Sequence, residues 1–227
     1  MNISFILVEP AVPSNIGASA RAIKTMGFTD LFLINPCDYK NNEATWLAHG
    51  SNDILDNAIV YNSFINCISQ FDYIIGTSAK QRTSKFDYYP IEVVNDVIIN
   101  KGNTIKNIGI VFGKEESGLT NDEIKQCDII SYIPMAHNYP SLNLSQAVML
   151  YAYQLSKLSS IEPENEETYQ DGSIYQALKN NIKKVLDTTP IPKNENLYHR
   201  ILERIAGAGK EDIHLINSVC NAIIKAE

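Results

Sequence analysis

The feature that most constrains the fold is an alternation of short apolar runs with stretches of helical periodicity. Residues 3–8 (ISFILV) form a run of strand type, and residues 31–34 (LFLI) form a second one. Between them Pro13-Ser14-Asn15 opens a helix, with Ser14 or Asn15 available as its N-cap, and Gly27 ends it. A strand, a helix and a strand in this order predict parallel pairing, because the helix carries the chain back before the second strand.

The same alternation continues to about residue 158. Three further runs have the composition of buried strands: residues 72–75 (DYII), 108–112 (IGIVF) and 129–133 (IISYI). Helical spacing marks residues 91–99 and 144–158, and Thr120 with Glu123 matches a capping box at the start of a short helix. We therefore expect an α/β fold, with a mainly parallel sheet and flanking helices.

Residues 159–172 (SSIEPENEETYQDG) divide the chain. They carry five acidic side chains and no basic one, and we interpret them as an acidic linker. Residues 1–158, with a net charge of −4, are predicted to form one domain, and residues 173–227, with a net charge of +2, a small helical C-terminal extension. The extension is expected to contain helices near residues 173–186, 195–205 and 210–225.

Composition excludes several classes of protein. The net charge of −7 argues against a protein that coats nucleic acid unselectively. No apolar run approaches the roughly 18 residues that span a bilayer, and the N-terminal MNISFILVEP does not match a signal peptide. The four cysteines are far apart and form no CxxC pair, so we expect no metal site and a cytoplasmic protein with reduced thiols.

Four segments that follow expected strands carry unusual residues. In open parallel sheets, ligands bind where the chain leaves the carboxyl ends of the strands. The segments are residues 13–21 (PSNIGASAR), 76–82 (GTSAKQR), 112–119 (FGKEESGL) and 133–143 (IPMAHNYPSLN). The third lacks the lysine of a P-loop and no GxGxxG follows any strand, which counts against both common nucleotide-binding loops. Each segment alone is typical of a turn or a helix cap, but the four in order indicate a ligand site.

Three of these segments carry a resemblance to a known family. Residues 15–21 (NIGASAR), 112–119 and 133–147 (IP…SLNLSQA) resemble the three ordered motifs of the SpoU-type RNA ribose methyltransferases of the SPOUT superfamily. The resemblance covers about residues 2–158. The short start, the helical tail and the Gly-Thr-Ser-Ala stretch at residues 76–79 look like the bacterial TrmJ type, which methylates the first residue of the tRNA anticodon loop.

The resemblance implies a reaction, a topology and partners. Proteins of this family transfer a methyl group from S-adenosylmethionine to a ribose 2′-hydroxyl of RNA, contain a deep trefoil knot in the C-terminal half of the domain, and work as homodimers. It favours tRNA as the substrate, because members that modify ribosomal RNA usually carry an N-terminal RNA-binding domain, for which there is no room before Ile3. The alternatives are methylation of another RNA such as rRNA, a non-catalytic RNA-binding protein on the same scaffold, and a small α/β enzyme that uses another nucleotide.

The resemblance also assigns residues. Arg21 matches the family's catalytic arginine, either as the base that accepts the hydroxyl proton or as a clamp on the neighbouring phosphate; its permanent charge suits the clamp. The other residues matched to catalysis are Asn15, Glu115, Ser141 and Asn143. The residues matched to the methyl donor are Thr77, Ser78, Ala79, Gly113, Ile133, Pro140, Ser141 and Leu142. Apolar Ile133 and Leu142 suit the two faces of the adenine, whereas Glu115 and Asn143 are expected to organise the loops.

RNA binding requires positive charge near the phosphates. We expect an RNA groove lined by basic side chains, namely Arg21, Lys24, Lys80, Arg82, Lys85, Lys179, Lys183, Lys184, Arg200 and Arg204, with the extension helping to select tRNA. Tyr88 and Tyr89 either stack on a base or pack within a loop. The apolar face of residues 144–158 forms either a dimer interface or part of the core.

Overall fold

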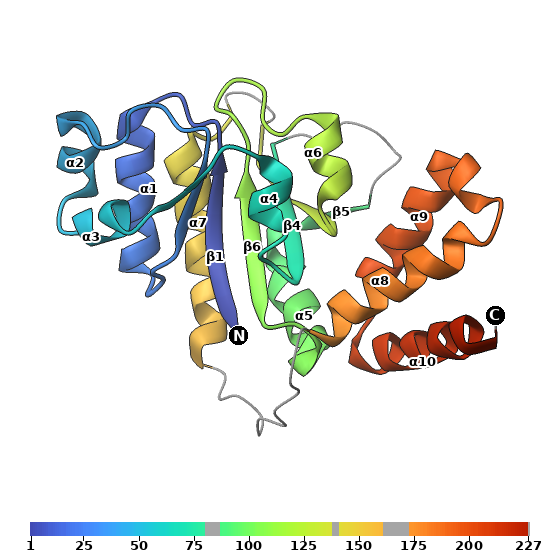
Figure 1. The fold of residues 1–227 in the computed structure, drawn as a ribbon. Helices are drawn as coiled ribbons and strands as arrows, with labels where there is room; N and C mark the ends of the chain where they lie inside the picture. The colour runs from blue at the N-terminus through green and yellow to red at the C-terminus, as the bar shows by residue number, and fades with distance from the viewer. Residues whose placement is uncertain (80–86, 138–140, 161–172, 227) are drawn as a thin grey trace.

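A central parallel sheet organises the molecule (Figure 1). The computed structural model describes residues 1–79, 87–137, 141–160 and 173–226, without the side chains of residues 159 and 160. Within these residues the sheet has seven strands in the order β3-β2-β1-β6-β4-β7-β5, and each neighbouring pair is parallel. The strands are β1 (Asn2–Val8), β2 (Leu31–Ile34), β3 (Ile59–Tyr61), β4 (Tyr73–Ser78), β5 (Tyr88–Pro90), β6 (Asn107–Phe112) and β7 (Ile129–Tyr132).

Helices cover both faces of this sheet. They are α1 (Pro13–Thr25), α2 (Asn42–Ala48), α3 (Asn52–Asp56), α4 (Phe64–Ile68), α5 (Ile91–Lys101), α6 (Asn121–Gln126), α7 (Leu144–Ser156), α8 (Ile174–Asp187), α9 (Glu195–Ala206) and α10 (Lys210–Ala226). Short 3-10 helices lie at η1 (Gly102–Thr104), η2 (Lys157–Ser160) and η3 (Ile191–Lys193). The prediction of an α/β fold with a mainly parallel sheet is confirmed.

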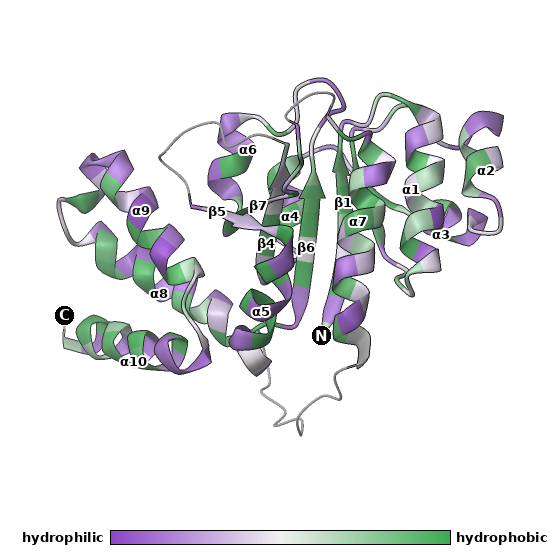
Figure 2. Ribbon diagram, turned by 180° about the vertical axis from the view of Figure 1, so that it is seen from behind, coloured by the Kyte–Doolittle hydropathy of each residue, from purple (hydrophilic) through white to green (hydrophobic). Residues whose placement is uncertain are grey.

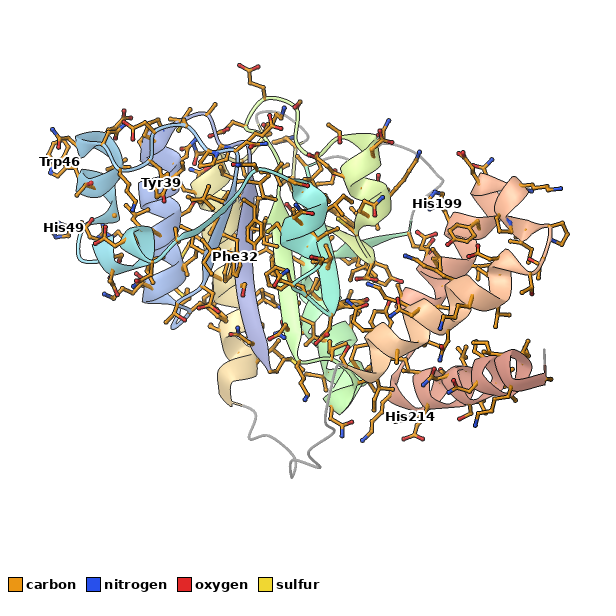
Figure 3. All side chains as sticks on the ribbon, in the orientation of Figure 1. Phe32, Tyr39, Trp46, His49, His199 and His214 are labelled. Carbon is orange, nitrogen blue, oxygen red and sulfur yellow. The ribbon has the colours of Figure 1, made fainter. Side chains whose placement is uncertain are left out.

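The core consists of two layers, one on each face of the sheet. Alternate residues of β1 point to opposite faces, so Phe5 belongs to the core cluster that includes residues of α1, α5, α7 and α8, whereas Ile6 belongs to the cluster that includes residues of α4 and α6. Burial on both faces explains why these strands read as continuous apolar runs in the sequence. Phe32, labelled in Figure 3, lies on the second face. Its ring contacts the rings of Tyr61 and Phe71.

Helix α1 starts differently from the expectation. Neither Ser14 nor Asn15 is its N-cap: the N-cap is Val12, whose side chain makes no capping hydrogen bond. Pro13 occupies the first turn, where its missing N–H has no helical partner to lose. One turn on, α1 approaches α2 so closely that a Cβ atom on Gly17 would lie 2.1 Å from the carbonyl oxygen of Ala44. Only glycine permits this contact, which fixes the position of α1.

The helical C-terminal extension packs onto the rest of the protein. Apolar side chains of α8, among them Leu178 and Ile182, are buried in the same cluster as the strands of the first face. A buried polar network adds to this contact. The Lys101 ammonium donates to the carbonyl oxygens of Ala206 at 2.5 Å and Ala208 at 2.6 Å, and the Tyr73 hydroxyl donates to Ala206 at 2.7 Å. The extension is therefore held by buried contacts on its α8 and α9 sides.

A second polar contact holds α8. Asp128, at the start of β7, accepts hydrogen bonds from the Ile74 N–H at 2.8 Å and the Tyr175 hydroxyl at 3.0 Å, and pairs with Lys179 at 3.1 Å. Lys101 lies over the ring of Tyr175 in the same region. Figure 1 shows α8, α9 and α10 together beside α5 and β4. Among the described residues, no helix is long and apolar enough to cross a membrane.

Candidate active site

Three neighbouring strands bring the predicted motif segments to one edge of the sheet. Gly76 of β4 pairs with Val111 of β6, and Ser78 of β4 pairs with Tyr132 of β7. Because the strands are parallel and in this register, the segments that follow β4, β6 and β7 leave the sheet at the same level. These segments carry the motifs described above, and their described residues lie at the top of Figure 1.

A hydrogen-bonded chain of side chains joins three motifs. The Asn15 amide nitrogen donates to the Glu115 carboxylate at 3.1 Å, and the Asn143 amide nitrogen donates to the Asn15 carbonyl oxygen at 2.8 Å. These residues are separated by 100 and 128 positions along the chain. Asn15 is only 9% exposed, so both of its bonds are shielded from water. We call these three side chains the motif relay.

Glu115 also fixes the loop that follows β1. Its carboxylate accepts hydrogen bonds from the backbone N–H of Ala11 at 3.1 Å and of Val12 at 3.3 Å. Burial alone would raise the pKa of this carboxyl, but these donors and the Asn15 amide together hold the pKa below its usual value. Glu115 is therefore ionised at neutral pH and acts as an acceptor for three donors.

Asn143 has a second role at the start of α7. Its carbonyl oxygen accepts from the Ser145 N–H at 2.9 Å, and Gln146 accepts from the Asn143 N–H at 3.0 Å, which completes a capping box. One side chain thus both caps α7 and binds Asn15. The predicted role of Asn143 as a residue that holds its loop matches this geometry.

The residues expected to hold the methyl donor surround the same edge. A Cβ atom at Gly113 would lie 2.1 Å from the Leu119 nitrogen, so the loop after β6 folds tightly on itself. The Thr77 hydroxyl donates to the Val111 carbonyl at 2.9 Å and ties β4 to β6. Ile133 and Leu142 are half-buried, which leaves apolar surface next to loop backbone. Ala79 and Ser141 are exposed at the same edge, whereas Pro140 lies outside the described residues.

Arg21 stands apart from the motif relay. It is an exposed residue of α1, six positions after Asn15, which corresponds to about 9 Å along the helix axis. Within the described part of the chain, no ion pair involves its guanidinium. The structure therefore brings Asn15, Glu115 and Asn143 together and leaves the predicted catalytic arginine open to a ligand.

Several basic residues expected in an RNA groove are bound to carboxylates instead. Lys24 pairs with Asp53 at 2.7 Å, and Lys179 pairs with the buried Asp128. Both arginines of α9 bind one acceptor, because Arg200 and Arg204 reach Asp87 at 3.1 and 3.2 Å. The charge of these four side chains is therefore partly neutralised within the chain, and their predicted place in an RNA groove stays a prediction. Lys183 and Lys184 are exposed, and Lys80, Arg82 and Lys85 lie outside the described residues.

The packing of α7 and of β5 bears on two further predictions. The apolar face of α7, which includes Val148 and Leu155, is buried in the core and is not an interface. Tyr88 and Tyr89 belong to the edge strand β5, and both are half-buried. They therefore lie in a strand and not in a loop, and stacking of either ring on a base stays a prediction.

A further pair of residues, which no sequence pattern indicated, lies at the same edge. Glu9 has a φ of +46°, a left-handed backbone conformation that is uncommon for a residue other than glycine. Its carboxylate pairs with Lys114 at 2.5 Å, which links the loops after β1 and β6 beside the bonds of Glu115. The only sequence signal was the position of Glu9 before Pro10 at a strand end, which does not reveal the partner.

The fold and this edge define a class of protein: an α/β protein whose ligand site is assembled from loops after neighbouring parallel strands. The described residues contain no group of three or more His, Cys, Asp or Glu side chains that could hold a metal ion. The chain belongs to the SpoU methylase family, because the sequence model of the SpoU rRNA Methylase family matches residues 2–153. The resemblance inferred from the three motifs is confirmed.

Relatives are similar over most or all of the chain. LasT of Escherichia coli K12, named an uncharacterized tRNA/rRNA methyltransferase, is 36% identical over 227 residues, covering 99% of this chain and 98% of LasT. The tRNA (cytidine-2′-O-)-methyltransferase TrmJ of Methanocaldococcus jannaschii is 38% identical over 157 residues, covering 67% of this chain and 66% of that protein. The similarity to LasT includes the helical extension.

Solved structures show the same fold. TrmJ from Z. mobilis ZM4 superposes with a TM-score of 0.69 at 24% identity, covering 98% of this chain and 99% of that one. AviRb from Streptomyces viridochromogenes, solved in complex with the cofactor AdoMet, gives a TM-score of 0.55 at 19% identity, covering 70% of this chain and 60% of AviRb.

Proposed function

We propose that this chain transfers a methyl group from S-adenosylmethionine to a ribose 2′-hydroxyl of tRNA. The observation that carries the proposal is the motif relay, which joins Asn15, Glu115 and Asn143 from three separate motifs of the SpoU methylase family at one edge of the sheet. A non-catalytic RNA-binding protein does not require these three side chains to be assembled there.

The residues at this edge suit the methyl donor. S-adenosylmethionine supplies an electrophilic methyl group on a sulfonium. The tight loop at Gly113 exposes backbone groups that can bond to the adenine edge, while half-buried Ile133 and Leu142 offer apolar surface for its faces. Thr77, Ser78, Ala79 and Ser141 lie at the same edge and complete the set that we assign to the donor, together with Pro140.

Arg21 is assigned to the RNA. In the reaction the ribose oxygen bonds to the methyl carbon, the carbon–sulfur bond breaks with its electron pair remaining on sulfur, and the hydroxyl proton passes to solvent. A guanidinium is almost always protonated, and Arg21 is exposed, so it binds the phosphate beside the target ribose and holds the hydroxyl in line. Asn15, Glu115 and Asn143 are positioning residues that hold the loops around this step.

The finer target that we propose is the first residue of the tRNA anticodon loop. The name of the M. jannaschii relative, a tRNA (cytidine-2′-O-)-methyltransferase, supports tRNA and ribose. The name of LasT includes rRNA as well as tRNA, which makes rRNA the second candidate. Reduced cysteines and an RNA substrate fit a cytoplasmic protein.

We further propose the deep trefoil knot of the resembling family. Strand β7 lies between β4 and β5, although β5 follows β4 in sequence, and the chain then returns so that α7 packs on α1. We also propose a homodimer in which the outer face of α7, with exposed Leu150 and Tyr153, forms the contact. We also propose that residues 1–158 form one domain, residues 159–172 a linker and residues 173–227 a helical extension.

The decisive experiment is methyl transfer from labelled S-adenosylmethionine to total tRNA, followed by mapping of the modified nucleoside. The expected product is one 2′-O-methylated nucleoside at the start of the anticodon loop. Ribosomal RNA is tested in parallel under the same salt concentration. Label found only in rRNA would show that rRNA, and not tRNA, is the substrate. Donor binding without transfer to either RNA would refute the proposed activity.

A further inference from the structure

Helix α10 carries a stripe of exposed apolar side chains. Leu215 is 65% exposed, Val219 52% and Ile223 40%, and their spacing of four residues places them on one face of the helix. Figure 2 shows apolar positions, in green, recurring along α10. Large apolar side chains that are this open are ordinary when scattered singly, but a contiguous row marks an interaction surface. We call these three residues the α10 stripe.

The opposite face of α10 already has a partner. Ile213 and Cys220 are buried in the core cluster. The amide of Asn181 on α8 donates to Asn217 at 2.9 Å and to Asn221 at 3.0 Å. Helix α10 is therefore fixed in place by α8 and presents the α10 stripe as a rigid surface.

The spacing along the stripe fits a second helix. Asp212, Leu215, Val219, Ala222 and Ala226 follow one another at intervals of three and four residues. Alternating three- and four-residue intervals form the narrow seam by which two helices pack side by side. A partner helix laid along this seam would cover Leu215, Val219 and the neighbouring Ile223.

The charges along α10 select the direction of that partner. Glu211 and Asp212 begin the helix, whereas Lys225 lies in its last turn. Between described residues, none of these three side chains forms an ion pair within the chain. An antiparallel copy of the same helix would place its basic end beside the acidic end, and a parallel copy would place like charges together.

We propose that α10 pairs with α10 of a second copy of this chain, antiparallel about a twofold axis at Val219. At about 100° per residue, Glu211 and Lys225 lie on the same flank of the stripe, about 40° apart. In the pair, Lys225 of one copy lies within about 3 Å of the level of Glu211 of the other along the helix axis. Leu215 and Ile223 are each four residues from Val219. Leu215 of one copy therefore lies at the same level along the helix axis as Ile223 of the other copy.

This contact is separate from the dimer proposed through α7. Leu150 lies on α7 and Val219 on α10, and Figure 1 shows α10 at the end of the molecule beyond α8, away from α7. The α10 pairing therefore joins two α7 dimers, or two single chains if the α7 contact does not form. Its test does not require methyl transfer, so failure of the proposed activity and failure of this pairing give different results.

The first test measures mass by sedimentation of the full chain over a range of protein concentrations. The wild type is expected to show a concentration-dependent species with twice the mass of the Val219→Asp variant, because a carboxylate at the axis opposes its own copy. Leu197→Asp is the matched control, since Leu197 is 45% exposed on α9, away from the stripe. Equal mass for wild type and Val219→Asp at every concentration overturns the pairing, as does an equal loss in the control.

A second test uses the charges. Glu211→Lys alone and Lys225→Glu alone are each expected to weaken association about tenfold, because each creates like-charge contacts on both sides of the twofold axis. The double variant restores opposite charges and is expected to associate as the wild type does. A double variant no stronger than either single variant would contradict the antiparallel direction.

Cross-linking locates the axis. Val219→Cys is expected to form a disulfide-linked pair on mild oxidation, because the two Cβ atoms approach across the axis. Lys183→Cys, an exposed position on α8, and the wild type with its own four cysteines are the controls. Protection of Val219→Cys from a thiol reagent by tRNA, with no cross-linked pair, would assign the stripe to RNA and overturn the proposal.

Discussion

Lys101 offers a quantitative test of how the extension is held. Its ammonium is fully buried between the rings of Tyr73 and Tyr175, and its acceptors are the carbonyls of Ala206 and Ala208. Burial lowers the pKa of Lys101 from 10.5 to about 8, against a smaller opposite effect of Asp128. The perturbation is Lys101→Met, which keeps a chain of similar length and removes the titrating group.

The sign of the pH dependence follows from this pKa. Between about pH 8 and pH 10.5 the unfolded chain keeps the Lys101 proton and the folded chain releases it, so the contribution of Lys101 to stability rises with pH. Integrated from pH 7 to pH 9, this difference in pKa corresponds to a gain on the order of 1 kcal/mol. Below pH 7 both states hold the proton and the contribution is constant.

The assay is urea unfolding of wild type and Lys101→Met at pH 7 and pH 9. The difference in unfolding free energy between wild type and variant is expected to move by roughly 1 kcal/mol in favour of the wild type at pH 9. Unfolded-state titration of the cysteines is common to both proteins and cancels in the difference. Lys183→Met, at an exposed site, should show no such change. A difference that is equal at the two pH values would refute a depressed pKa at Lys101.

Three predictions concern the site. Asn15→Leu should lower the turnover of methyl transfer by at least about tenfold, because two buried hydrogen bonds to Glu115 and Asn143 are lost; unchanged turnover would remove the motif relay from the mechanism. Gly113→Ala should abolish measurable donor binding in calorimetry, since its Cβ would lie 2.1 Å from a backbone nitrogen; normal affinity would contradict the assigned pocket. Arg21→Ala should abolish transfer while donor affinity stays within a few fold, and surviving activity would exclude the phosphate clamp.

Much of the sheet could be predicted from sequence because its strands are buried on both faces. Continuous apolar runs identified β1, β2, β6 and β7 with ends shifted by at most a residue, and the capping box of Thr120 and Glu123 is confirmed. Helices α2, α3 and α4 were missed. They have only five to seven residues, and such short helices depend on contacts such as that of Gly17 with Ala44 rather than on periodicity.

The grouping of the motifs at one edge of the sheet was predictable from the sequence, whereas their ion-pair partners were not. Motif order indicated that Asn15, Glu115 and Asn143 lie together, because parallel strands deliver their loops to one edge. Ion pairs were not predictable, since Arg200 meets Asp87 over a separation of 113 residues and nothing local signals the partner. The burial of Lys101 was not predictable either. A lysine at the end of an amphipathic helix is expected to be exposed to solvent, whereas α8 and α9 bury Lys101.

The contact of Lys101 with Ala206 has a consequence for synthesis on the ribosome. The acceptor lies 105 residues after the donor, which at about 5–20 residues per second corresponds to roughly 5–20 seconds of translation. Until α9 has emerged, the sheet of the nascent chain exposes the surface on which α8 packs and a cation without its carbonyls. A chain interrupted before α9 therefore lacks both carbonyl acceptors of Lys101 and leaves the surface under α8 and α9 open to proteases and chaperones.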